Sequence, residues 1–441
     1  MRVRVPPSVP ALDPSCPIGS HRRIFRGAHV NEQGFQAPPI VTTPGENPPD
    51  VSIIMPCLNE IQSLPHCIAN ARAALDQVGA AYGLTGEIII ADNGSTDGSQ
   101  AYATAHGARV VQVARRGYGA ALIGGCEGAW GRYLLMGDAD GSYDFTDGVA
   151  MIGRLVDGAD LCMGSRFAGG IARGAMPWKN RYIGNPLLTG MLNLFFRSGI
   201  DDAHCGIRAI TKRAFTECGL TSTGMEFASE MVVKASLRGL KIEQAPATLS
   251  PDLRDRAPHL RPWRDGWRHL RYLLMLSPTW VFGVPAVLAM LIALGLMSAA
   301  AMYDLGWLTG APVIGAGWTV VAGFMLTVGH FAAIMAMATH FYGVRCGYRT
   351  WRGWFDRLSP VLTLEHALVA GLGMMLFSAV SLVVIAAKWR AGGFLPLPSV
   401  LPLVSAVALG AVGVQTALGG FLLAIIAGHD AAFVPSEEDG Q

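Results

Sequence analysis

The chain has 441 residues, of which 51% are hydrophobic and 15% are charged, and its formal net charge at pH 7 is +2. The length allows two or three domains, while the hydrophobic content excludes a wholly water-soluble protein. The small net charge lacks the basic excess of nucleic-acid-binding proteins, so we expect no nucleic-acid partner. The apolar excess begins near Leu276, and the residues before it have the composition of a mixed globular protein.

The N-terminal residues 1–49 are rich in proline, glycine and polar side chains, and this composition predicts a disordered tail. No continuous apolar segment of the kind found in signal peptides follows Arg2 and Arg4. The eight cysteines are scattered and lack the paired spacing of zinc ligands, which favours a reducing compartment.

Strands and helices are predicted to alternate through residues 50–258. Five runs have strand character. The first starts at Val51 and is broken by Pro56, and the others are Glu87–Asp92, Ala108–Val113, Tyr133–Met136 and Asp160–Arg166. Helical patterns separate these runs, and this order predicts an α/β domain with an open, mainly parallel sheet.

Polar side chains stand at the carboxyl ends of the predicted strands. They are Asn59 and Glu60, Asp92, Asp138 and Asp140, and Arg166. Ligands bind at this edge of open parallel sheets. Each of these residues alone could be a helix cap or a turn residue, but that explanation fits poorly for so many neighbouring strand ends. Asp138 and Asp140 are separated by one alanine, and acids this close repel each other unless a cation lies between them. We therefore predict that Mg²⁺ or Mn²⁺ binds here together with a diphosphate.

A dinucleotide-dependent dehydrogenase is the main competitor for such a fold. It requires a Gly-x-Gly-x-x-Gly motif after the first strand, where this chain has Pro56-Cys-Leu-Asn-Glu60. The turn Gly117-Tyr-Gly119 comes two units later and lacks the third glycine at the required spacing. The sequence therefore argues against a dehydrogenase.

Four motifs follow the strands in a defined order. They are Pro56-Cys-Leu-Asn59-Glu60, Asp92-Asn-Gly-Ser-Thr-Asp97, Gly117-Tyr-Gly119-Ala-Ala and Asp138-Ala139-Asp140. In this order and spacing they resemble the motifs of inverting family 2 glycosyltransferases with the Rossmann-like GT-A fold. The resemblance implies a donor-nucleotide site made of Pro56, Asn59, Glu60, Asp92, Asp97, Gly117, Gly119, Asp138 and Ala139. It also implies that Asp138 and Asp140 hold the metal on a nucleotide sugar, with Asp140 acting in catalysis. The family often has a second acid after Asp92, and this chain has Asn93 there.

Within that family the chain looks most like the polyprenyl-phosphate sugar transferases, the dolichyl-phosphate mannose and glucose synthases. The likeness covers about residues 50–275 and rests on Gly164-Ser-Arg166-Phe, Asn180-Arg181-Tyr-Ile-Gly-Asn185, Asp202-Ala-His-Cys-Gly-Ile-Arg208 and Glu226-Phe-Ala-Ser-Glu230. It implies an acceptor-phosphate site made of Arg166, Arg181, Asn185, Arg208, Arg254 and Arg256. The usual Arg-then-Ser-Lys-Leu segment of that subgroup is replaced here by Arg254-Asp-Arg256-Ala-Pro. The Gln-x-x-Arg-Trp signature of processive synthases does not occur, which favours transfer of a single sugar.

The acceptor chemistry supports the same interpretation. A lipid phosphate is already an anion at neutral pH, so the enzyme mainly has to bring it into line with the anomeric carbon. Guanidinium groups bind phosphate oxygens in a bidentate way, which suits Arg166 and Arg181 as catalytic residues. Glu230 is a candidate base or orienting residue, and a surface or buried ion pair is the alternative for it.

We expect inverting transfer of one hexose from a UDP-glucose or GDP-mannose type donor to a polyprenyl phosphate. One alternative is a glycosyltransferase that acts on a neutral glycolipid or a growing glycan, and this enzyme would require a carboxylate base. The other is a catalytically silent membrane scaffold or lipid-carrier partner, against which the intact Asp138-Ala-Asp140 motif argues.

Residues 259–277 are predicted to form an amphipathic helix at the membrane surface. Its apolar stripe is Leu260, Trp263, Trp267, Leu270 and Leu274, and its basic stripe is Arg261, Arg264, Arg268 and Arg271. Tryptophan and arginine in this arrangement suit the headgroup layer of membrane lipids. The alternative is a helix that docks on the soluble domain.

An all-α transmembrane domain is predicted for residues 278–428, with spans at about 280–302, 313–341, 367–387 and 399–428. The loop after the second span carries Arg345, Arg349, Arg352 and Arg357. Because basic loops are cytoplasmic, the catalytic domain, this loop and the acidic tail 429–441 are predicted to be cytosolic. His330 and His340 lie in the second span, where we expect a neutral histidine hydrogen-bonded between helices. The spans could also support a homo-oligomer.

Overall fold

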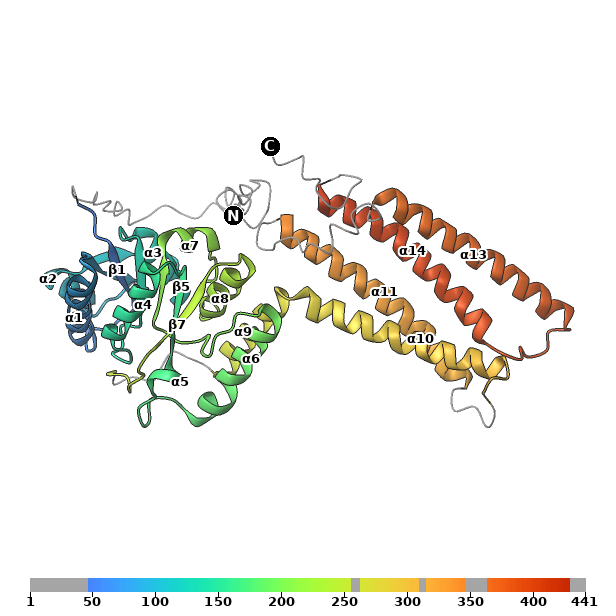
Figure 1. The fold of residues 1–441 in the computed structure, drawn as a ribbon, viewed down its shortest axis with the longest axis horizontal. Coiled ribbons are helices and arrows are strands. Elements are labelled where there is room, and N and C mark those ends of the chain that lie inside the picture. The colour runs from blue at the N-terminus through green and yellow to red at the C-terminus, as the bar shows by residue number, and fades with distance from the viewer. Residues whose placement is uncertain (1–46, 255–261, 309–314, 346–362, 429–441) are drawn as a thin grey trace, which may run out of the picture. The chain divides into compact units, whose positions relative to one another are not determined.

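The computed structural model describes residues 47–254, 262–308, 315–345 and 363–428. The chain forms two compact units, which divide between Leu276 and Ser277. The first is an α/β domain, and the second is built of long helices (Figure 1). Several predicted features lie outside the described residues, namely most of the tail 1–49, Arg256, Leu260, Arg261, the basic loop from Arg349 to Arg357, and the tail 429–441.

A seven-stranded sheet forms the centre of the α/β domain, in the order β3-β2-β1-β4-β6-β5-β7. The strands are β1 (Val51–Cys57), β2 (Gly86–Asp92), β3 (Arg109–Gln112), β4 (Tyr133–Met136), β5 (Leu161–Ser165), β6 (Arg208–Thr211) and β7 (Ile242–Pro246). Neighbouring strands are parallel except around β6, which runs antiparallel to β4 and β5. The predicted α/β class with a mainly parallel sheet is confirmed.

Two strands, β6 and β7, are absent from the sequence-based prediction. β6 has only four residues and opens with Arg208, and β7 carries Glu243, Gln244 and a final Pro246. β7 lies at the edge of the sheet, where polar residues and proline are tolerated. Both strands therefore lack the continuous apolar run that predicts a strand from sequence.

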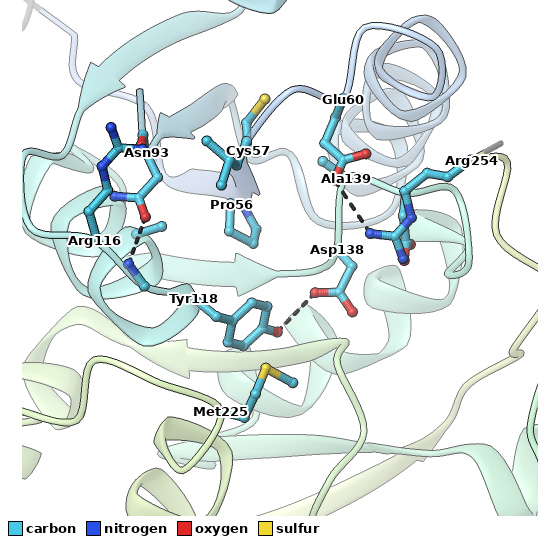
Figure 2. A pocket seen from close by; sticks show the side chains of 14 residues that line it. Pro56, Cys57, Glu60, Asn93, Arg116, Tyr118, Asp138, Ala139, Met225 and Arg254 are labelled. Carbon is cyan, nitrogen blue, oxygen red and sulfur yellow. Dashed lines mark hydrogen bonds and ion pairs between the residues drawn. The ribbon is translucent and has the colours of Figure 1, made fainter. Parts of the chain in front are cut away.

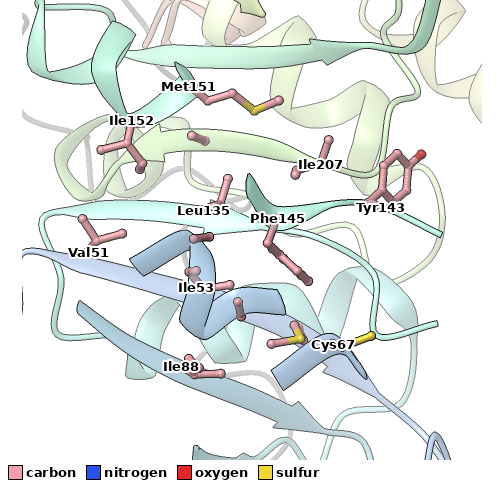
Figure 3. Close-up of a cluster of buried hydrophobic side chains, with 14 of the residues drawn as sticks. Val51, Ile53, Cys67, Ile88, Leu135, Tyr143, Phe145, Met151, Ile152 and Ile207 are labelled. Carbon is pink, nitrogen blue, oxygen red and sulfur yellow. The ribbon is translucent and has the colours of Figure 1, made fainter. Parts of the chain in front are cut away.

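Helices cover both faces of the sheet. They are α1 (Leu64–Tyr82), α2 (Ser99–Ala105), α3 (Tyr118–Gly128), α4 (Gly148–Val156), α5 (Arg166–Gly169), α6 (Asn185–Phe196), α7 (Lys212–Cys218), α8 (Phe227–Leu237) and α9 (Pro262–Met275), with the short helical turns η1 (Phe145–Asp147) and η2 (Asn180–Gly184). One hydrophobic cluster joins α1, α2 and α4 to the sheet, and Figure 3 shows part of it around Ile53, Leu135 and Phe145. Ile54 belongs to a second cluster with α3, α6, α7, α8 and α9. Because successive side chains of a strand point to opposite faces, the two clusters cover the two sides of the sheet.

The strand register brings the ends of three neighbouring strands to one edge of the sheet. Cys57 at the end of β1 is level with Asp92 at the end of β2, and Ile54 is level with Met136 at the end of β4. The chain segments that leave these strands therefore begin side by side. The loops after β1, β2 and β4 form one surface, and the predicted site residues of the first half lie on it.

Helix α9 forms close to the predicted range, but it buries a different face. His269 and Leu273 are buried, and α9 packs against α6 and α8. The Nδ1 atom of His269 lies 2.8 Å from the hydroxyl oxygen of Ser229 in α8. Trp267 remains 60% exposed, and Arg271 is exposed as well. Helix α9 thus docks on the domain, as the alternative interpretation has it. Part of the predicted tryptophan and arginine face stays exposed, and its contact with a membrane stays a prediction.

Within the described ranges of the second unit, four helices are long and apolar enough to cross a membrane. They span Thr279–Asp304, Ala316–Arg345, Leu364–Ala391 and Leu401–Ala427, and comprise the turn η3 (Thr279–Gly283) with α10 (Val284–Asp304), then α11 (Ala316–Arg345), α13 (Leu364–Ala391) and α14 (Leu401–Ala427). α11 packs against both α10 and α14, and α13 packs against α14 (Figure 1). The predicted helical C-terminal part of the fold is confirmed.

His330 in α11 makes its hydrogen bonds within this group of helices. Its Nδ1 atom lies 3.0 Å from Gln415 Oε1, and its Nε2 atom lies 3.3 Å from Thr416 Oγ1. Both partners belong to α14. The expected role of a hydrogen-bonding histidine between helices is therefore confirmed for His330.

Lys212, the first residue of α7, caps the end of α3. Its ammonium group donates to the carbonyl oxygens of Cys126 at 2.5 Å, Ala129 at 2.9 Å and Glu127 at 3.2 Å. The last carbonyl groups of a helix lack partners within the helix, and a cation there also interacts favourably with the helix dipole. Lys212 thereby fixes the end of α3 next to the sheet.

We expect Lys212→Met to lower the free energy of unfolding by about 1–2 kcal/mol, because the substitution removes a charged cap from half-buried carbonyl groups. Thermal unfolding of the detergent-solubilised chain measures this change. Lys241→Met is the matched control, since Lys241 pairs with Glu243 at an exposed position and should change stability by at most about 0.5 kcal/mol. Equal effects of the two substitutions would contradict the capping role.

Candidate active site

A pocket of about 350 Å³ opens at the carboxyl edge of the sheet (Figure 2). Its lining residues are Pro56, Cys57, Leu58, Glu60, Asn93, Arg116, Gly117, Tyr118, Ala121, Asp138, Ala139, Asp140, Met225 and Arg254. The pocket brings together predicted residues that follow β1, open α3 and follow β4, and adds Arg254 from far along the chain. Its size suits a small-molecule substrate.

The acids Asp138 and Asp140 lie in different environments although one residue separates them. The Tyr118 hydroxyl donates to Asp138 Oδ1 at 2.9 Å (Figure 2). Asp140 Oδ1 accepts from the backbone N–H and the hydroxyl of Ser142, at 3.0 and 2.6 Å. Burial, followed by repulsion from Asp140, raises the pKa of Asp138 to about 6. The Asp138 carboxylate thus lacks sufficient compensating positive charge within the protein.

Arg254 supplies the positive charge that faces Asp140. Its Nη2 atom lies 2.7 Å from Asp140 Oδ2 and 3.0 Å from Asp252 Oδ2, and its Nη1 atom lies 3.4 Å from Glu60 Oε1. The resemblance to the polyprenyl-phosphate transferases implies acceptor-phosphate binding by Arg254. The structure shows its guanidinium on the acids of the predicted donor site, and the implied acceptor role stays a prediction.

The carboxylates of the pocket fit a metal that a substrate helps to bind. Among the residues that the structure describes, no group of three or more His, Cys, Asp or Glu side chains could hold a metal ion by itself. Mg²⁺ commonly binds through one or two carboxylates together with substrate phosphates and water. Asp138 and Asp140 match this partial ligand set, because both line the pocket and Asp138 is short of positive charge.

Two glycines allow the 221–224 loop to pack closely against the start of α3 beside the pocket. A Cβ atom on Gly117 would lie 2.2 Å from the carbonyl oxygen of Thr223, and one on Gly119 would lie 2.3 Å from that of Ser222. Gly117 also has φ +130°, which side-chain-bearing residues rarely adopt. These glycines are therefore needed for close backbone approach, and of the two only Gly117 lines the pocket.

Glu230 holds the 221–224 loop in place and lies outside the pocket lining. Its carboxylate is fully buried, pairs with Lys234 at 2.8 Å, and accepts from the backbone N–H groups of Thr221 and Ser222. Lys234 and these hydrogen bonds lower the pKa of Glu230 against the effect of burial. Glu230 is absent from the pocket lining, so the buried ion pair, the alternative considered from sequence, is what the structure shows.

The residues Asn59, Asp92 and Asp97 shape the loops of the donor site without lining the pocket. Asp92 accepts from the backbone N–H groups of Gly94 and Ser95 and from the Gln100 amide. Asn59 accepts from the backbone N–H of Thr96, and Asp97 accepts from that of Ile61. These three side chains therefore cross-link the loops after β1 and β2, and the direct nucleotide contact expected for them stays a prediction.

Asn93 reaches the pocket where Asp92 does not. Its amide donates to the carbonyl oxygens of Val113 and Arg115 and accepts from the backbone N–H of Gly117. Arg116 donates to the carbonyl oxygen of Asn93 at 2.8 Å (Figure 2). The side chains of Asn93, Arg116, Tyr118 and Met225 were missed by the sequence analysis. The motif around Gly117 could have indicated Tyr118, while Met225 follows a loop without a sequence signal.

The remaining predicted arginines do not converge on the pocket. Arg166 is buried and forms a bidentate ion pair with Asp202, at 2.6 and 2.7 Å. Arg208 is buried as well and donates to the carbonyl oxygens of Cys205 and Ala228. Both guanidinium groups already have partners within the protein, and the acceptor-phosphate role implied for Arg166 and Arg208 stays a prediction.

Arg181 and Asn185 lie apart from the pocket lining, on η2 and the start of α6. The guanidinium of Arg181 lies 5.5 Å from the ring centre of Tyr182. Asn185 points its amide at the sulfur of Met176, 3.5 Å away. No ion pair of Arg181 occurs among the described residues, so its guanidinium has the freedom that Arg166 and Arg208 lack.

Comparison with known proteins shows the family to which the chain belongs. The model of glycosyl transferase family 2 matches residues 52–219, and that of the family 2 C-terminal transmembrane region matches residues 337–427. The low-salt glycan biosynthesis hexosyltransferase Agl6 from Haloferax volcanii is 35% identical over 85% of this chain and 88% of its own length. The chain belongs to glycosyl transferase family 2. It is a glycosyltransferase and an integral membrane protein with an N-terminal catalytic domain.

Other relatives are similar over the catalytic domain. The polyprenol monophosphomannose synthase of Mycolicibacterium smegmatis is 27% identical over 50% of this chain and 83% of that protein. Glucosyl-3-phosphoglycerate synthase from Mycobacterium tuberculosis, solved with Mn²⁺ and uridine diphosphate, is 20% identical over 52% of this chain and 78% of that chain, with a TM-score of 0.38. A structural similarity this low supports no inference about substrate.

The buried ion pair between Arg166 and Asp202 makes the stability of this family 2 glycosyltransferase sensitive to the removal of one partner. Arg166→Met leaves Asp202 buried and unpaired, and we expect it to lower the free energy of unfolding by about 3–5 kcal/mol. Arg166→Met combined with Asp202→Asn should recover part of that loss, because no buried charge remains, while the single amide oxygen of asparagine can replace only one of the two carboxylate oxygens that accept the backbone N–H groups of Arg166 and His204. Thermal unfolding compares the variants. A strong loss of sugar transfer by the folded double variant would favour a direct role of Arg166 in catalysis.

His204 forms a buried polar cluster of the glycosyltransferase with Ser229 and His269. Its Nε2 atom lies 3.2 Å from the Ser229 hydroxyl oxygen, and the two histidine rings are 4.7 Å apart. Burial lowers the pKa of His204 well below 6.5, and His269, Arg166 and Arg208 lower it further. The folded state therefore keeps this imidazole neutral under conditions in which an exposed histidine is protonated.

This difference makes stability depend on pH. As the pH falls through about 6.5, the unfolded chain takes up a proton at His204 and the folded chain does not, so the free energy of unfolding decreases. We expect His204→Asn to reduce the fall in melting temperature between about pH 8 and about pH 5. His66→Asn is the control, since His66 is exposed. An unchanged pH profile in the His204 variant would show that another group causes the dependence.

Proposed function

We propose that this glycosyltransferase carries out metal-dependent, inverting transfer of one hexose from a nucleotide sugar to a polyprenyl phosphate. The observation that carries the proposal is the pair Asp138 and Asp140 in a pocket at the carboxyl edge of the sheet. Relatives that act on polyprenyl carriers support the acceptor. Besides the polyprenol monophosphomannose synthase, the dolichyl-phosphate β-glucosyltransferase of Drosophila melanogaster is 37% identical over 27% of this chain and 41% of that protein.

The donor side of the reaction is assigned to the pocket. Pro56, Asn93, Arg116 and Gly117 surround the nucleotide in this assignment, and Asn59, Asp92 and Asp97 act indirectly by fixing the loops. Asp138 and Asp140 hold Mg²⁺ or Mn²⁺, with Ala139 between them. The cation, when bound, neutralises charge on the diphosphate leaving group. Tyr118 orients Asp138 through its hydroxyl.

The acceptor reacts without a protein base. A phosphate oxygen of the acceptor attacks the anomeric carbon, the bond from that carbon to the donor diphosphate breaks, and nucleoside diphosphate leaves with the electron pair. The nucleophile is already an anion, so the engagement of Glu230 with Lys234 is compatible with this step. Neutral acceptors would need a free carboxylate base.

The surface around Arg181 supports a lipid phosphate as the acceptor. Trp178 and Tyr182 are 61% and 67% exposed, and Ile183 and Leu187 are exposed as well. Lys179 and Arg181 lie beside the aromatic rings of Trp178 and Tyr182. Apolar side chains interleaved with cations suit an isoprenoid phosphate at the cytoplasmic membrane face. We assign Arg181 to the acceptor phosphate on this basis.

The test incubates membranes containing the full chain with labelled UDP-glucose or GDP-mannose and either a polyprenyl phosphate or the corresponding polyprenol. We expect a labelled product only with the phosphorylated lipid. Asp140→Asn should reduce transfer by at least about 100-fold, because the leaving group loses its electrostatic stabilisation. Arg181→Ala should raise the KM for the lipid by about tenfold or more, the loss of one charge-assisted hydrogen bond.

Arg132→Ala is the control for Arg181, since Arg132 pairs with Asp50 at an exposed position outside the pocket. Equal transfer to polyprenol and polyprenyl phosphate would indicate a neutral acceptor. Absence of transfer and of nucleotide-sugar binding with every donor would instead favour a membrane scaffold. Full activity of Asp140→Asn would refute the metal assignment alone.

A further inference from the structure

The guanidinium of Arg254 contacts three carboxylates at the edge of the pocket. Its guanidinium faces Asp140, Asp252 and Glu60, with nitrogen–oxygen distances of 2.7, 3.0 and 3.4 Å. Its side chain is only 14% exposed. Asp140 Oδ1 accepts two hydrogen bonds from Ser142, and Oδ2 accepts one from Arg254.

The chain segment that carries Arg254 is attached to the loop that carries the acids. The backbone N–H of Leu253 donates to the carbonyl oxygen of Asp140 at 2.9 Å, and that of Ser250 donates to the carbonyl oxygen of Ser142 at 2.8 Å. The side chain of Leu253 covers Gly141 so closely that a Cβ there would lie 2.6 Å from its Cδ1 atom. The contact between Arg254 and Asp140 is thus built into the local fold. The guanidinium can still change partners by side-chain rotation while this backbone stays in place.

The Asp140 oxygen cannot serve Arg254 and a divalent cation equally at one time. A guanidinium and a metal ion at hydrogen-bond distance from the same oxygen repel each other strongly, because both are positive. A diphosphate relieves this conflict, since its oxygens accept the planar guanidinium fork in the way a carboxylate does. Arg254 already lines the pocket in which we place the donor diphosphate.

We propose that Arg254 is an exchangeable counter-ion, which leaves Asp140 for the donor diphosphate as the divalent cation binds, so that cation and donor bind cooperatively. This inference rests on the proposed metal-dependent donor site. Without ligands, the guanidinium binds Asp140, Glu60 and Asp252. With cation and donor bound, it binds the diphosphate. Arg254 is thus a residue of the donor side, which couples two ligands.

The experiment measures Mn²⁺ binding to the purified full chain by electron paramagnetic resonance, without nucleotide and with UDP or GDP. Binding of Mn²⁺ to the free nucleotide is measured separately and subtracted. In the unsubstituted protein, one of the nucleotides should tighten Mn²⁺ binding by about tenfold, a typical coupling between two sites. Arg254→Gln should bind Mn²⁺ without nucleotide about tenfold more tightly than the unsubstituted protein, because the competing cation is gone. The tightening by nucleotide should then be smaller in the variant.

Arg132→Gln is the matched control, as it removes an arginine that pairs with Asp50 outside the pocket. It should leave Mn²⁺ binding unchanged. Unchanged or weaker Mn²⁺ binding in a folded Arg254→Gln protein would overturn the exchange. If that variant does not fold, the unsubstituted protein still decides, because equal Mn²⁺ affinity with and without both nucleotides contradicts cooperative binding. Absence of Mn²⁺ binding to the unsubstituted protein under all conditions would instead refute the metal-dependent function itself.

Discussion

The compensation of buried carboxylates is the constraint on which the architecture of this domain depends. A carboxylate that leaves water without a partner is costly, so each one needs a cation or several N–H donors. Asp202 is paired with Arg166, Glu230 with Lys234, and Asp92 with backbone and amide N–H groups. Asp138 differs, since a hydroxyl is its hydrogen-bond donor and its pKa is raised to about 6. The structural acids are satisfied within the protein, and the pocket acid remains available to an outside cation.

Sequence reasoning reached the parts of the site that depend on local order. Apolar runs predicted the strands, and the acids after them predicted the edge at which Asp138 and Asp140 lie. Ion pairing between distant segments was beyond its reach, because nothing in the pattern around Arg166 indicates Asp202 as its partner, or Asp140 as the partner of Arg254. The bidentate geometry that suits phosphate suits carboxylate equally well. An arginine motif therefore predicts an anion partner and leaves open whether that anion belongs to the protein.

The sequence pattern of the amphipathic helix α9 also left its partner open. Its tryptophans and arginines predicted a membrane surface, whereas His269 and Leu273 bury a different face against the domain. A polar residue such as His269 is read as exposed from sequence, and it is buried here because Ser229 provides a hydrogen-bond partner. The partner of Glu230, in contrast, is local. Lys234 lies four residues further along the same helix, so this ion pair could have been recognised from helical spacing.

The reversed direction of β6 has a consequence for how later sequence reaches a site made by earlier sequence. A parallel strand delivers its last residues to the active edge, and an antiparallel strand delivers its first. Arg208, at the start of β6, is therefore level with Met136 at the end of β4, and its charge acts on Asp138 to lower the pKa of that acid. Gly206 just before it comes so close that a Cβ would lie 2.6 Å from Asp138 Oδ2. The antiparallel direction of β6 thus places Gly206 and Arg208, from the second half of the domain, next to Asp138 from the first half, without an additional loop.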